Sequence, residues 1–387
     1  MKNDIQKESL AIHKKLRGKI EITPKAKLTK KSLGLFYTPG VGAVSTHIAE
    51  HPEAAMKMTL RGNTVAVVSD GSAVLGLGNI GPLAALPVME GKAMLFKTLA
   101  GVDAFPIVLN TQDPDAIVEI VKALEPSFGA INLEDIAAPQ CFEIERRLRE
   151  ALKIPVMHDD QHGTAMVVLS GLINALLVRG SKKNEVRVVV NGAGAAGTAI
   201  VQLLLMYGFE HIVMVDSQGA IHNGRKGMSD EKKHLATITN RFCHIDEEHV
   251  LCTKGDLRAA LFGADVFIGV SKGGILKEDM VRAMNPDPII FALANPVPEI
   301  YPDEAKKAGA LVVATGRSDF PNQINNALGF PGIFRGALDH GVTEITDTML
   351  VRAAEKLAGI IKKPTPTMII PSPFDKSVVK AVSSAIR

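Results

Sequence analysis

Short apolar runs rich in β-branched residues alternate with longer amphipathic segments along most of the chain. Alternation of this kind is typical of α/β proteins with mainly parallel sheets. It predicts strands at residues 64–69, 105–109, 130–133, 154–157, 186–190, 211–215, 266–270, 289–292 and 311–314. It also predicts helices at residues 82–99, 115–124, 141–152, 163–177 and 195–206, with a further helix within residues 4–17.

A glycine-rich turn directly follows the strand predicted at residues 186–190 and opens the next helix. The following strand ends in Asp216, about 20 residues past the last glycine, where an acid takes the ribose hydroxyls of a dinucleotide. This is the complete fingerprint of a dinucleotide site, with the helix N-terminus facing the pyrophosphate. The predicted binding turn is Gly192, Ala193, Gly194, Ala195, Ala196 and Gly197.

The expected cofactor is NAD or NADP. Asp216 favours NAD, because its carboxylate repels the 2′-phosphate of NADP, whereas Arg225 and Lys226 nearby offset that repulsion. A second G-x-G-x-x-G pattern, at Gly76 to Gly81, precedes a strand with no acid at its tip. It therefore predicts a close-packed turn beside the substrate cleft rather than a second nucleotide site.

These patterns divide the chain of 387 residues. We expect an N-terminal α/β catalytic domain at residues 1–157 and a C-terminal Rossmann-type, doubly wound NAD(P)-binding domain at residues 158–387. The helices after residue 346 are free to pack on either domain.

Acidic residues follow two of the predicted strands, Glu134 and Asp135 after one and Asp159 and Asp160 after the other. Residues just past strand ends line the ligand crevice of an α/β sheet, and carboxylates converging there require a cation. Oxygen donors favour Mg²⁺ or Mn²⁺. The alternatives are that these acids only cap helices, or that the nearby His158 and His162 form a zinc pair.

Composition excludes several classes. Hydrophobic residues make up 46% of the chain, enough for sizeable cores, and the net charge of +3 is scattered, so no nucleic-acid partner is expected. The apolar run at residues 186–206 contains Arg187, Asn191 and Gln202, which favours a strand, turn and helix over a membrane span. The polar N-terminus predicts no secretory signal. Three cysteines, Cys141, Cys243 and Cys252, predict neither a disulfide framework nor a thiolate zinc site, and hence a reducing, cytoplasmic compartment.

An ordered set of motifs spanning roughly residues 10 to 345 resembles the malic enzymes, most closely their small-subunit prokaryotic branch. The motifs are Tyr37-Thr38-Pro39-Gly40-Val41, Asp70-Gly71 through Gly76-Leu77-Gly78, Glu90-Gly91-Lys92, Glu134-Asp135, Asp159-Asp160-Gln161-His162-Gly163, Ala294-Asn295-Pro296, and Asn325-Asn326 before Phe330-Pro331-Gly332. The resemblance implies oxidative decarboxylation of L-malate to pyruvate and CO₂ with reduction of NAD(P)⁺, and a homodimer.

The resemblance also implies roles for individual residues. Tyr37 corresponds to the general acid, Lys92 to the general base, and Asp159 to the carboxylate that tunes the lysine. The metal ligands correspond to Glu134, Asp135 and Asp160, and the substrate-binding side chains to Asn295 and Asn326, with Asn295 also near the nicotinamide. To act as a base, Lys92 needs a depressed pKa, which burial and a nearby divalent ion are expected to supply.

One position departs from the family pattern. Ala73 stands where larger malic enzymes carry an arginine that binds a substrate carboxylate, so that carboxylate needs another partner, such as Ser72, the glycine-turn amides or a basic residue from elsewhere.

Three other functions remain open: a hydroxy-acid dehydrogenase without decarboxylation, a metal-dependent hydrolase built on residues 158–162, and a non-catalytic NAD-binding sensor. None of these needs both the acidic cluster and the dinucleotide fingerprint.

Overall fold

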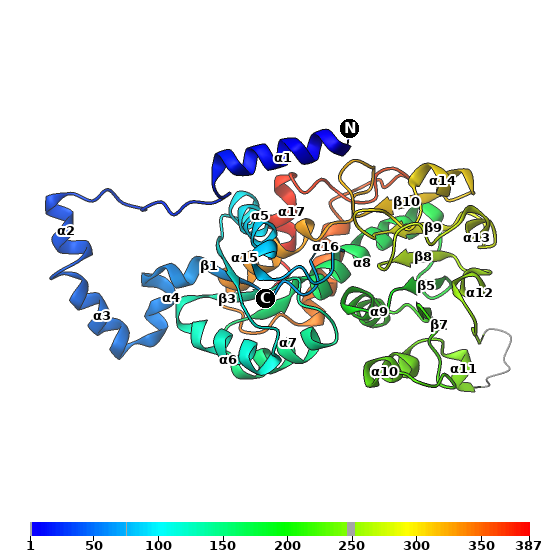
Figure 1. Ribbon diagram of the computed structural model, residues 1–387, viewed down its shortest axis with the longest axis horizontal. Helices are drawn as coiled ribbons and strands as arrows, with labels where there is room; N and C mark the ends of the chain where they lie inside the picture. The colour runs from blue at the N-terminus through cyan, green and yellow to red at the C-terminus, as the bar shows by residue number, and fades with distance from the viewer. Residues whose placement is uncertain (1, 75, 246–251) are drawn as a thin grey trace.

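The computed structural model describes residues 2–74, 76–245 and 252–387, and it contains two parallel-stranded sheets with helices on both faces (Figure 1). The α/β class and the parallel sheets predicted from the sequence are confirmed. Most strand bounds agree with the prediction to within a residue or two, because a strand that is buried on both faces is a continuous apolar run.

The first sheet has the strand order β2 (Asp103–Val108), β1 (Thr64–Ser69), β3 (Ala130–Leu133), β4 (Val156–His158), all parallel. One face packs against α5 (Pro82–Ala100), and the other against α6 (Pro114–Leu124) and α7 (Gln140–Ala151). Residues of β1 alternate between the two hydrophobic cores, with Val65 and Val67 in one and Ala66 and Val68 in the other. This alternation is the period of two that a strand imposes.

The second sheet has the order β10 (Val312–Thr315), β9 (Ile289–Ala292), β8 (Val266–Gly269), β5 (Arg187–Asn191), β6 (His211–Asp216), β7 (Gly219–Ala220). All pairs are parallel except β6 with β7. From β5 the chain first adds β6 and β7 on one side, and it then returns to add β8, β9 and β10 on the other side. The topological switch point therefore lies between β5 and β8. That is where doubly wound sheets bind nucleotides. The short helices α12 (Leu257–Leu261), α13 (Glu278–Arg282) and α14 (Pro302–Lys307) cover one face.

Helix α8 (Asp159–Arg179) joins the two units and packs against α9 (Ala195–Tyr207). It begins at Asp159, not at Gly163 as predicted, because the first turn consists of polar residues that carry no apolar periodicity. Its length and hydropathy would suit a membrane span, but 72% of its apolar window is buried inside the protein. It is therefore a core helix. The apolar run at residues 186–206 forms β5, the glycine turn and α9, as expected.

The last helices divide between the units. Helices α15 (Phe330–His340) and α17 (Lys376–Ser383) contact α5 of the first unit, whereas α16 (Asp347–Ala358) lies on α8 and α9. Phe96 of α5 contacts Phe330 and Phe334 of α15 with ring centroids 4.7 and 5.4 Å apart. All three rings are fully buried, and each contributes roughly 1.5–3 kcal/mol through apolar burial. The C-terminal segment thus fixes one unit against the other.

Residues 20–58 form an arm that leaves the body as an extended segment (Figure 1). The arm follows α1 (Lys2–Leu16) and contains α2 (Lys30–Phe36), α3 (Val41–Glu50), the short 3₁₀ helix Pro52–Ala54 and α4 (Ala55–Met58). None of its helices α2, α3 and α4 has a buried residue. Most of its large apolar side chains are exposed, among them Ile22 (82%), Leu35 (67%) and Phe36 (56%). Exposure on this scale marks a surface made to be covered.

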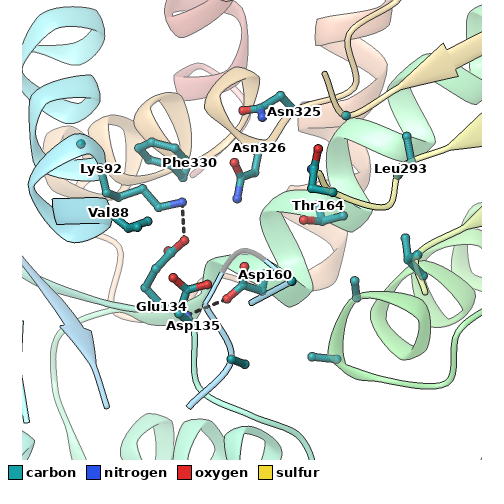
Figure 2. Close-up of a pocket in the computed structure, with 18 of the residues that line it drawn as sticks. Val88, Lys92, Glu134, Asp135, Asp160, Thr164, Leu293, Asn325, Asn326 and Phe330 are labelled. Carbon is teal, nitrogen blue, oxygen red and sulfur yellow. Dashed lines mark hydrogen bonds and ion pairs between the residues drawn. The ribbon is translucent and has the colours of Figure 1, made fainter. Parts of the chain in front are cut away.

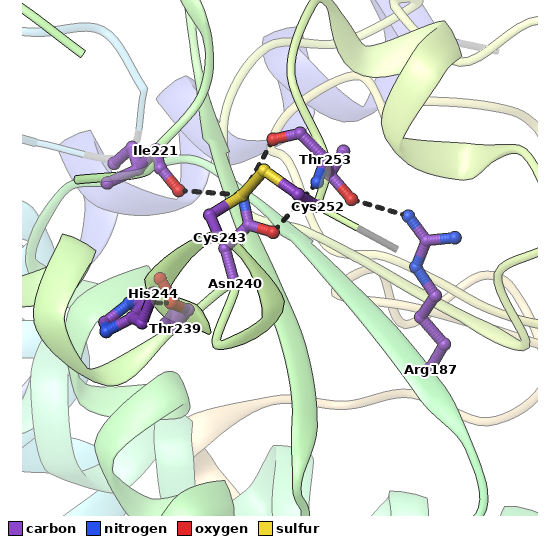
Figure 3. The surroundings of a disulfide bond; sticks show 8 residues. All are labelled: Arg187, Ile221, Thr239, Asn240, Cys243, His244, Cys252 and Thr253. Atoms are coloured by element: carbon purple, nitrogen blue, oxygen red, sulfur yellow. Dashed lines mark hydrogen bonds between the residues drawn. A yellow bond between two sulfur atoms is a disulfide. The ribbon is translucent and has the colours of Figure 1, made fainter. Parts of the chain in front are cut away.

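A disulfide bond joins Cys243 and Cys252, with an S–S distance of 2.07 Å (Figure 3). The cysteine count predicts no disulfide framework, and it gives no sign of this single bond. Cys243 lies on α11 (Phe242–Ile245), which follows α10 (Asp230–Ile238). The Asn240 side chain donates to the Thr253 carbonyl at 2.7 Å and accepts from its N–H at 3.0 Å, which brings the two cysteine-bearing segments together. The cysteine count therefore no longer supports a reducing compartment.

Candidate active site

The acidic residues predicted at two strand tips come together at one edge of the first sheet. Strands β3 and β4 are parallel neighbours with Leu133 opposite His158, so the residues that follow them emerge side by side. Carboxylate oxygens of Glu134, Asp135 and Asp160 all lie within 4.8 Å of one another (Figure 2). Among the described residues, this is the group that brings three potential metal ligands together.

Hydrogen bonds hold this cluster in place. The Asp135 N–H donates to Asp160 Oδ2 at 2.8 Å, and Asn132 Nδ2 donates to Glu134 Oε2 at 2.9 Å. Asp135 has a φ of 54°, a left-handed conformation that aspartate tolerates better than most residues and that is common at functional sites. The helix-capping alternative is wrong for these acids: α7 is capped by Pro139, and α8 by His158 without a side-chain bond.

Lys92 reaches this cluster from α5 on the opposite wall. Its Nζ lies 2.8 Å from Glu134 Oε1 and 2.5 Å from Asp159 Oδ2, and 4.1 Å from the centre of the Phe330 ring. The side chain is 7% exposed. Lys92 is therefore a buried cation held between carboxylates at the edge of a cavity, and not a solvated helix lysine.

The electrostatics of the cluster bear on one expectation. Burial alone would lower the pKa of Lys92, but the charges of Asp159, Glu134 and Asp160 raise it above its ordinary value. Burial raises the pKa of Glu134 well above its usual range, and it raises that of Asp159 to about 6. The neighbouring carboxylates therefore outweigh burial at Lys92, so the expected depressed pKa depends on a divalent ion that offsets their charge.

The donor set fits a hard divalent ion. Four carboxylates, those of Glu134, Asp135, Asp159 and Asp160, face one ammonium group, which leaves an excess of negative charge in a largely buried site. Octahedral Mg²⁺ binds oxygens at about 2.1 Å, so its ligand oxygens lie roughly 3 to 4 Å apart. The three clustered carboxylates need only small side-chain adjustments to reach that spacing.

Behind the cluster lies a buried network centred on Glu145 of α7, a residue that the sequence analysis did not single out. Its carboxylate accepts from the His158 N–H at 2.8 Å, from Gln161 Nε2 at 3.1 Å and from His162 Nε2 at 3.0 Å. His162 is therefore bonded to Glu145 and does not join His158 as a zinc pair. The arrangement anchors the first turn of α8, which carries Asp159 and Asp160.

A cavity of about 970 Å³ opens from the acidic cluster toward the second sheet. It is lined by Lys92, the cluster and Phe330 on one side and by Gly194, Ala195, Ala196 and Asn295 on the other. Asn326 reaches the same region and donates to Asp159 Oδ2 at 2.6 Å. The predicted substrate residues and the first turn of α9 thus meet in one cavity.

The glycine turn has the predicted form. A Cβ on Gly197 would lie 1.8 Å from the Gly192 carbonyl oxygen, so no larger residue fits where α9 packs on the turn. On the other side of the turn, a second cavity of about 640 Å³ is lined by Gly192, Ala193 and Asp216. The two cavities flank the N-terminus of α9, as expected for the two halves of a dinucleotide.

Asp216, at the tip of β6, is not a bare carboxylate. Its Oδ2 accepts from Arg225 and from Lys232, each at 2.7 Å, and its Oδ1 accepts from the Gln218 N–H at 2.8 Å. Burial alone would raise the pKa of Asp216, but these hydrogen bonds lower it to about 2. Arg225 was anticipated from the sequence, whereas Lys232 was not, because it comes from a separate helix, α10.

The first glycine turn packs against the second unit. A Cβ on Gly76 would lie 2.4 Å from the Asn295 carbonyl oxygen, and both residues line the large cavity. Ser72 donates to Asp70 at 2.6 Å and accepts from the Ala137 N–H, so its hydroxyl stabilises the turn. Besides Lys92, the described basic residues that line the cavity are His13 and Lys19.

Of the predicted catalytic residues, Lys92 lines this cavity and Asp159 contacts its Nζ, whereas Tyr37 lies away from both. It follows α2, a helix of the arm, its side chain is 67% exposed, and it is not among the described lining residues.

Comparison with known proteins matches both parts of the chain. Residues 17–149 match the family described as malic enzyme, N-terminal domain, and residues 161–386 match the family described as malic enzyme, NAD binding domain. The bifunctional malic/malolactic enzyme of Bacillus subtilis (strain 168) is 54% identical over 386 residues, which is 99% of this chain and 92% of that protein. The NAD-dependent malic enzyme of Geobacillus stearothermophilus is 53% identical, covering 95% of this chain and 76% of that protein.

The chain is also similar to malic enzymes that are named as NADP-dependent. The NADP-dependent malic enzyme of Rhizobium meliloti (strain 1021) is 47% identical, covering 98% of this chain and 51% of that protein. Among solved structures, the NAD-dependent malic enzyme from Thermotoga maritima superimposes with a TM-score of 0.92 at 51% identity, covering 97% of this chain and 98% of that one.

Proposed function

Because the chain belongs to the malic enzyme family, whose reaction is the oxidative decarboxylation of L-malate with NAD(P)⁺, we propose how its residues divide that work. The observation that carries the proposal is the buried group of Glu134, Asp135 and Asp160 facing Lys92 across one cavity. A dehydrogenase without decarboxylation has no need of this cluster, and a hydrolase has no need of the dinucleotide turn.

Glu134, Asp135 and Asp160 hold the divalent ion, Mg²⁺ or Mn²⁺. When bound, the ion supplies polarisation of the oxygen atoms at C1 and C2 of malate and offsets the carboxylate charge around Lys92, and NAD(P)⁺ supplies the hydride acceptor. Lys92 Nζ takes the proton of the C2 hydroxyl as hydride leaves C2. Asp159 orients Nζ through its 2.5 Å contact.

Substrate contacts come from both units. Asn326 and Asn295 hold malate, and Asn295 also lies beside the nicotinamide ring. Of the two basic residues besides Lys92 that line the cavity, His13 and Lys19, Lys19 is the one we assign to the distal carboxylate in the absence of an arginine at Ala73. Its Nζ donates to the Pro87 carbonyl at 2.6 Å, on the same helix as Lys92. Tyr37 protonates C3 after CO₂ is lost, which yields pyruvate.

The dinucleotide spans the turn at residues 192–197, with its adenosine ribose at Asp216. We propose that the chain accepts both NAD⁺ and NADP⁺. Arg225 and Lys232 together outweigh the charge of Asp216, and Lys232 lines the ribose cavity. This weakens the discrimination against a 2′-phosphate that a bare aspartate would impose.

The proposed function is tested by assaying the purified protein with malate, Mn²⁺ and either dinucleotide, following both reduced cofactor and CO₂. We expect reduced cofactor and CO₂ in equal amounts with NAD⁺ and with NADP⁺, and loss of both signals in EDTA. Reduction of cofactor without CO₂, or turnover that survives EDTA, contradicts the proposal.

We further propose that the chain is a homodimer in which each arm completes the partner's active site. The arm exposes Tyr37 together with apolar side chains such as Ile22, Leu35 and Phe36, which the described part of the chain leaves largely uncovered. A second copy covers this surface, and its cavity receives Tyr37 as the general acid that protonates C3. We also propose that the chain divides into its two domains near residue 158, where α8 leads from the first unit into the second.

Mixing two inactive variants tests the shared site. In a hybrid of a Tyr37→Phe chain and a Lys92→Ala chain, a tyrosine acting across the interface leaves one site fully intact, so about half of the wild-type activity per dimer is expected. Differently tagged chains allow the hybrid to be purified. Recovery of no activity in a hybrid shown to be dimeric places Tyr37 and Lys92 of the same chain in one site.

A further inference from the structure

Glu299 is a fully buried carboxylate at the carboxyl edge of the second sheet, between the dinucleotide turn and Asn295. Its side chain has no solvent exposure. Its Oε1 accepts from the Ser271 N–H at 3.1 Å, and its Oε2 accepts from the Ala294 N–H at 3.0 Å. Burial raises the pKa of this carboxyl group. A buried acid is costly, so its retention calls for a compensating role.

The two amides that Glu299 accepts from belong to the segments that follow β8 and β9. Ser271 and Ala294 both line the large cavity, and Asn295 is the next residue along the chain. The Ser271 hydroxyl accepts from Asn191 Nδ2 at 2.6 Å, which extends the connection to the end of β5. One carboxylate therefore ties together the three strand tips that surround the nicotinamide end of the cavity.

The surrounding packing shows that space is reserved for this carboxylate. A Cβ on Gly269 would lie 2.5 Å from Glu299 Oε1, so glycine is required where the side chain crosses β8. A Cβ on Gly273 would lie 2.5 Å from the Val297 carbonyl oxygen, so the loops after β8 and β9 are in close contact. Asn295 in turn contacts Gly76 of the first unit.

We infer that Glu299 is a positioning residue that fixes the Ser271 and Asn295 segments around the nicotinamide ring, so that hydride transfer between malate and the ring has the correct geometry. This inference rests on the proposed function. Glu299 is not among the residues that line either cavity, so it acts through the backbone of Ser271 and Ala294. Misplacing reacting groups by about 1 Å can cost on the order of 10²-fold in rate.

The test compares Glu299→Gln with Glu299→Leu and with the control Glu304→Gln, an exposed glutamate on α14. Glutamine keeps one acceptor oxygen but turns an NH₂ group toward the second amide, whereas leucine leaves two buried N–H groups without partners. Two readouts are measured besides activity. One is the affinity for NADH against that for 5′-AMP, which lacks the nicotinamide. The other is the primary isotope effect with malate deuterated at C2.

For Glu299→Gln we expect NADH affinity to fall about tenfold, roughly the value of one or two buried hydrogen bonds, with 5′-AMP affinity changed less than about threefold. The isotope effect on kcat should rise as hydride transfer becomes rate-limiting, and Glu304→Gln should behave as wild type. Equal loss of NADH and 5′-AMP binding, or unchanged NADH binding and isotope effect in Glu299→Gln, overturns the inference. Failure of the wild type to bind NADH overturns the proposed function itself.

Discussion

Lys92→Ala is expected to lower kcat for malate by about 10²–10⁴-fold, the usual cost of losing a general base. Nζ is the basic group that faces the acidic cluster inside the cavity, and its position is fixed by Glu134 and Asp159. The effect should fall mainly on malate oxidation, because the proton that Lys92 takes comes from the C2 hydroxyl. Decarboxylation of added oxaloacetate should be reduced less.

Lys97→Ala is the matched control for this variant. Lys97 lies on the same helix, but it is exposed and pairs with Asp103 at 2.7 Å, away from the cavity. Because Lys92→Ala removes the cation that faces two buried carboxylates, the thermal unfolding of both variants is followed alongside the kinetics. Near-wild-type turnover of malate by a folded Lys92→Ala protein contradicts the assigned role.

Asp160→Asn is expected to weaken Mn²⁺ binding by at least about 100-fold. Loss of a residue that only supports a metal ligand costs up to about 100-fold in affinity, and loss of a ligand should cost at least as much. Turnover at a fixed, subsaturating Mn²⁺ concentration should fall in proportion. In the absence of metal the stability of the variant should differ little from that of wild type, because the charge of Asp160 repels Glu134 but attracts Lys92, and the two effects oppose each other. Mn²⁺ should stabilise the wild type against thermal unfolding and the variant far less.

Asp303→Asn is the control, since Asp303 also lies in the first turn of a helix but is exposed. Titration of Mn²⁺ by calorimetry, with thermal unfolding in EDTA and in Mn²⁺, provides the readouts. Equal Mn²⁺ affinity for wild type and Asp160→Asn rules out Asp160 as a ligand.

Much of the architecture follows from local patterns in the sequence. Buried parallel strands are continuous apolar runs, so their positions were predictable to within a residue or two, and so was the turn whose Gly197 tolerates no side chain. The convergence of Glu134, Asp135 and Asp160 was also predictable, because neighbouring parallel strands end at the same edge of a sheet.

Other features depend on contacts that no local pattern encodes. Lys232 reaches Asp216 from a different helix, and Glu299 is buried by loops that follow two other strands. Glutamate in a loop is ordinarily solvated, so only the surrounding Gly269 and Gly273 hint that it turns inward. The raised pKa of Lys92 depends on the balance between burial and three carboxylates, which requires coordinates.

The structure of a single chain does not bring Tyr37 to the cavity. Its motif is recognisable in the sequence, but the fold places it on an arm with exposed apolar side chains. Its proposed role therefore requires a second copy, and the arm has the composition of a surface that such a copy would bury.

The central claim is that carboxylates from two strand tips hold one divalent ion beside the nicotinamide end of the cavity. Anomalous diffraction from crystals soaked in Mn²⁺ tests it most directly. The account predicts a single strong peak about 2.0–2.3 Å from one oxygen each of Glu134, Asp135 and Asp160. A peak at another site, or none at this one under conditions that support turnover, would contradict it.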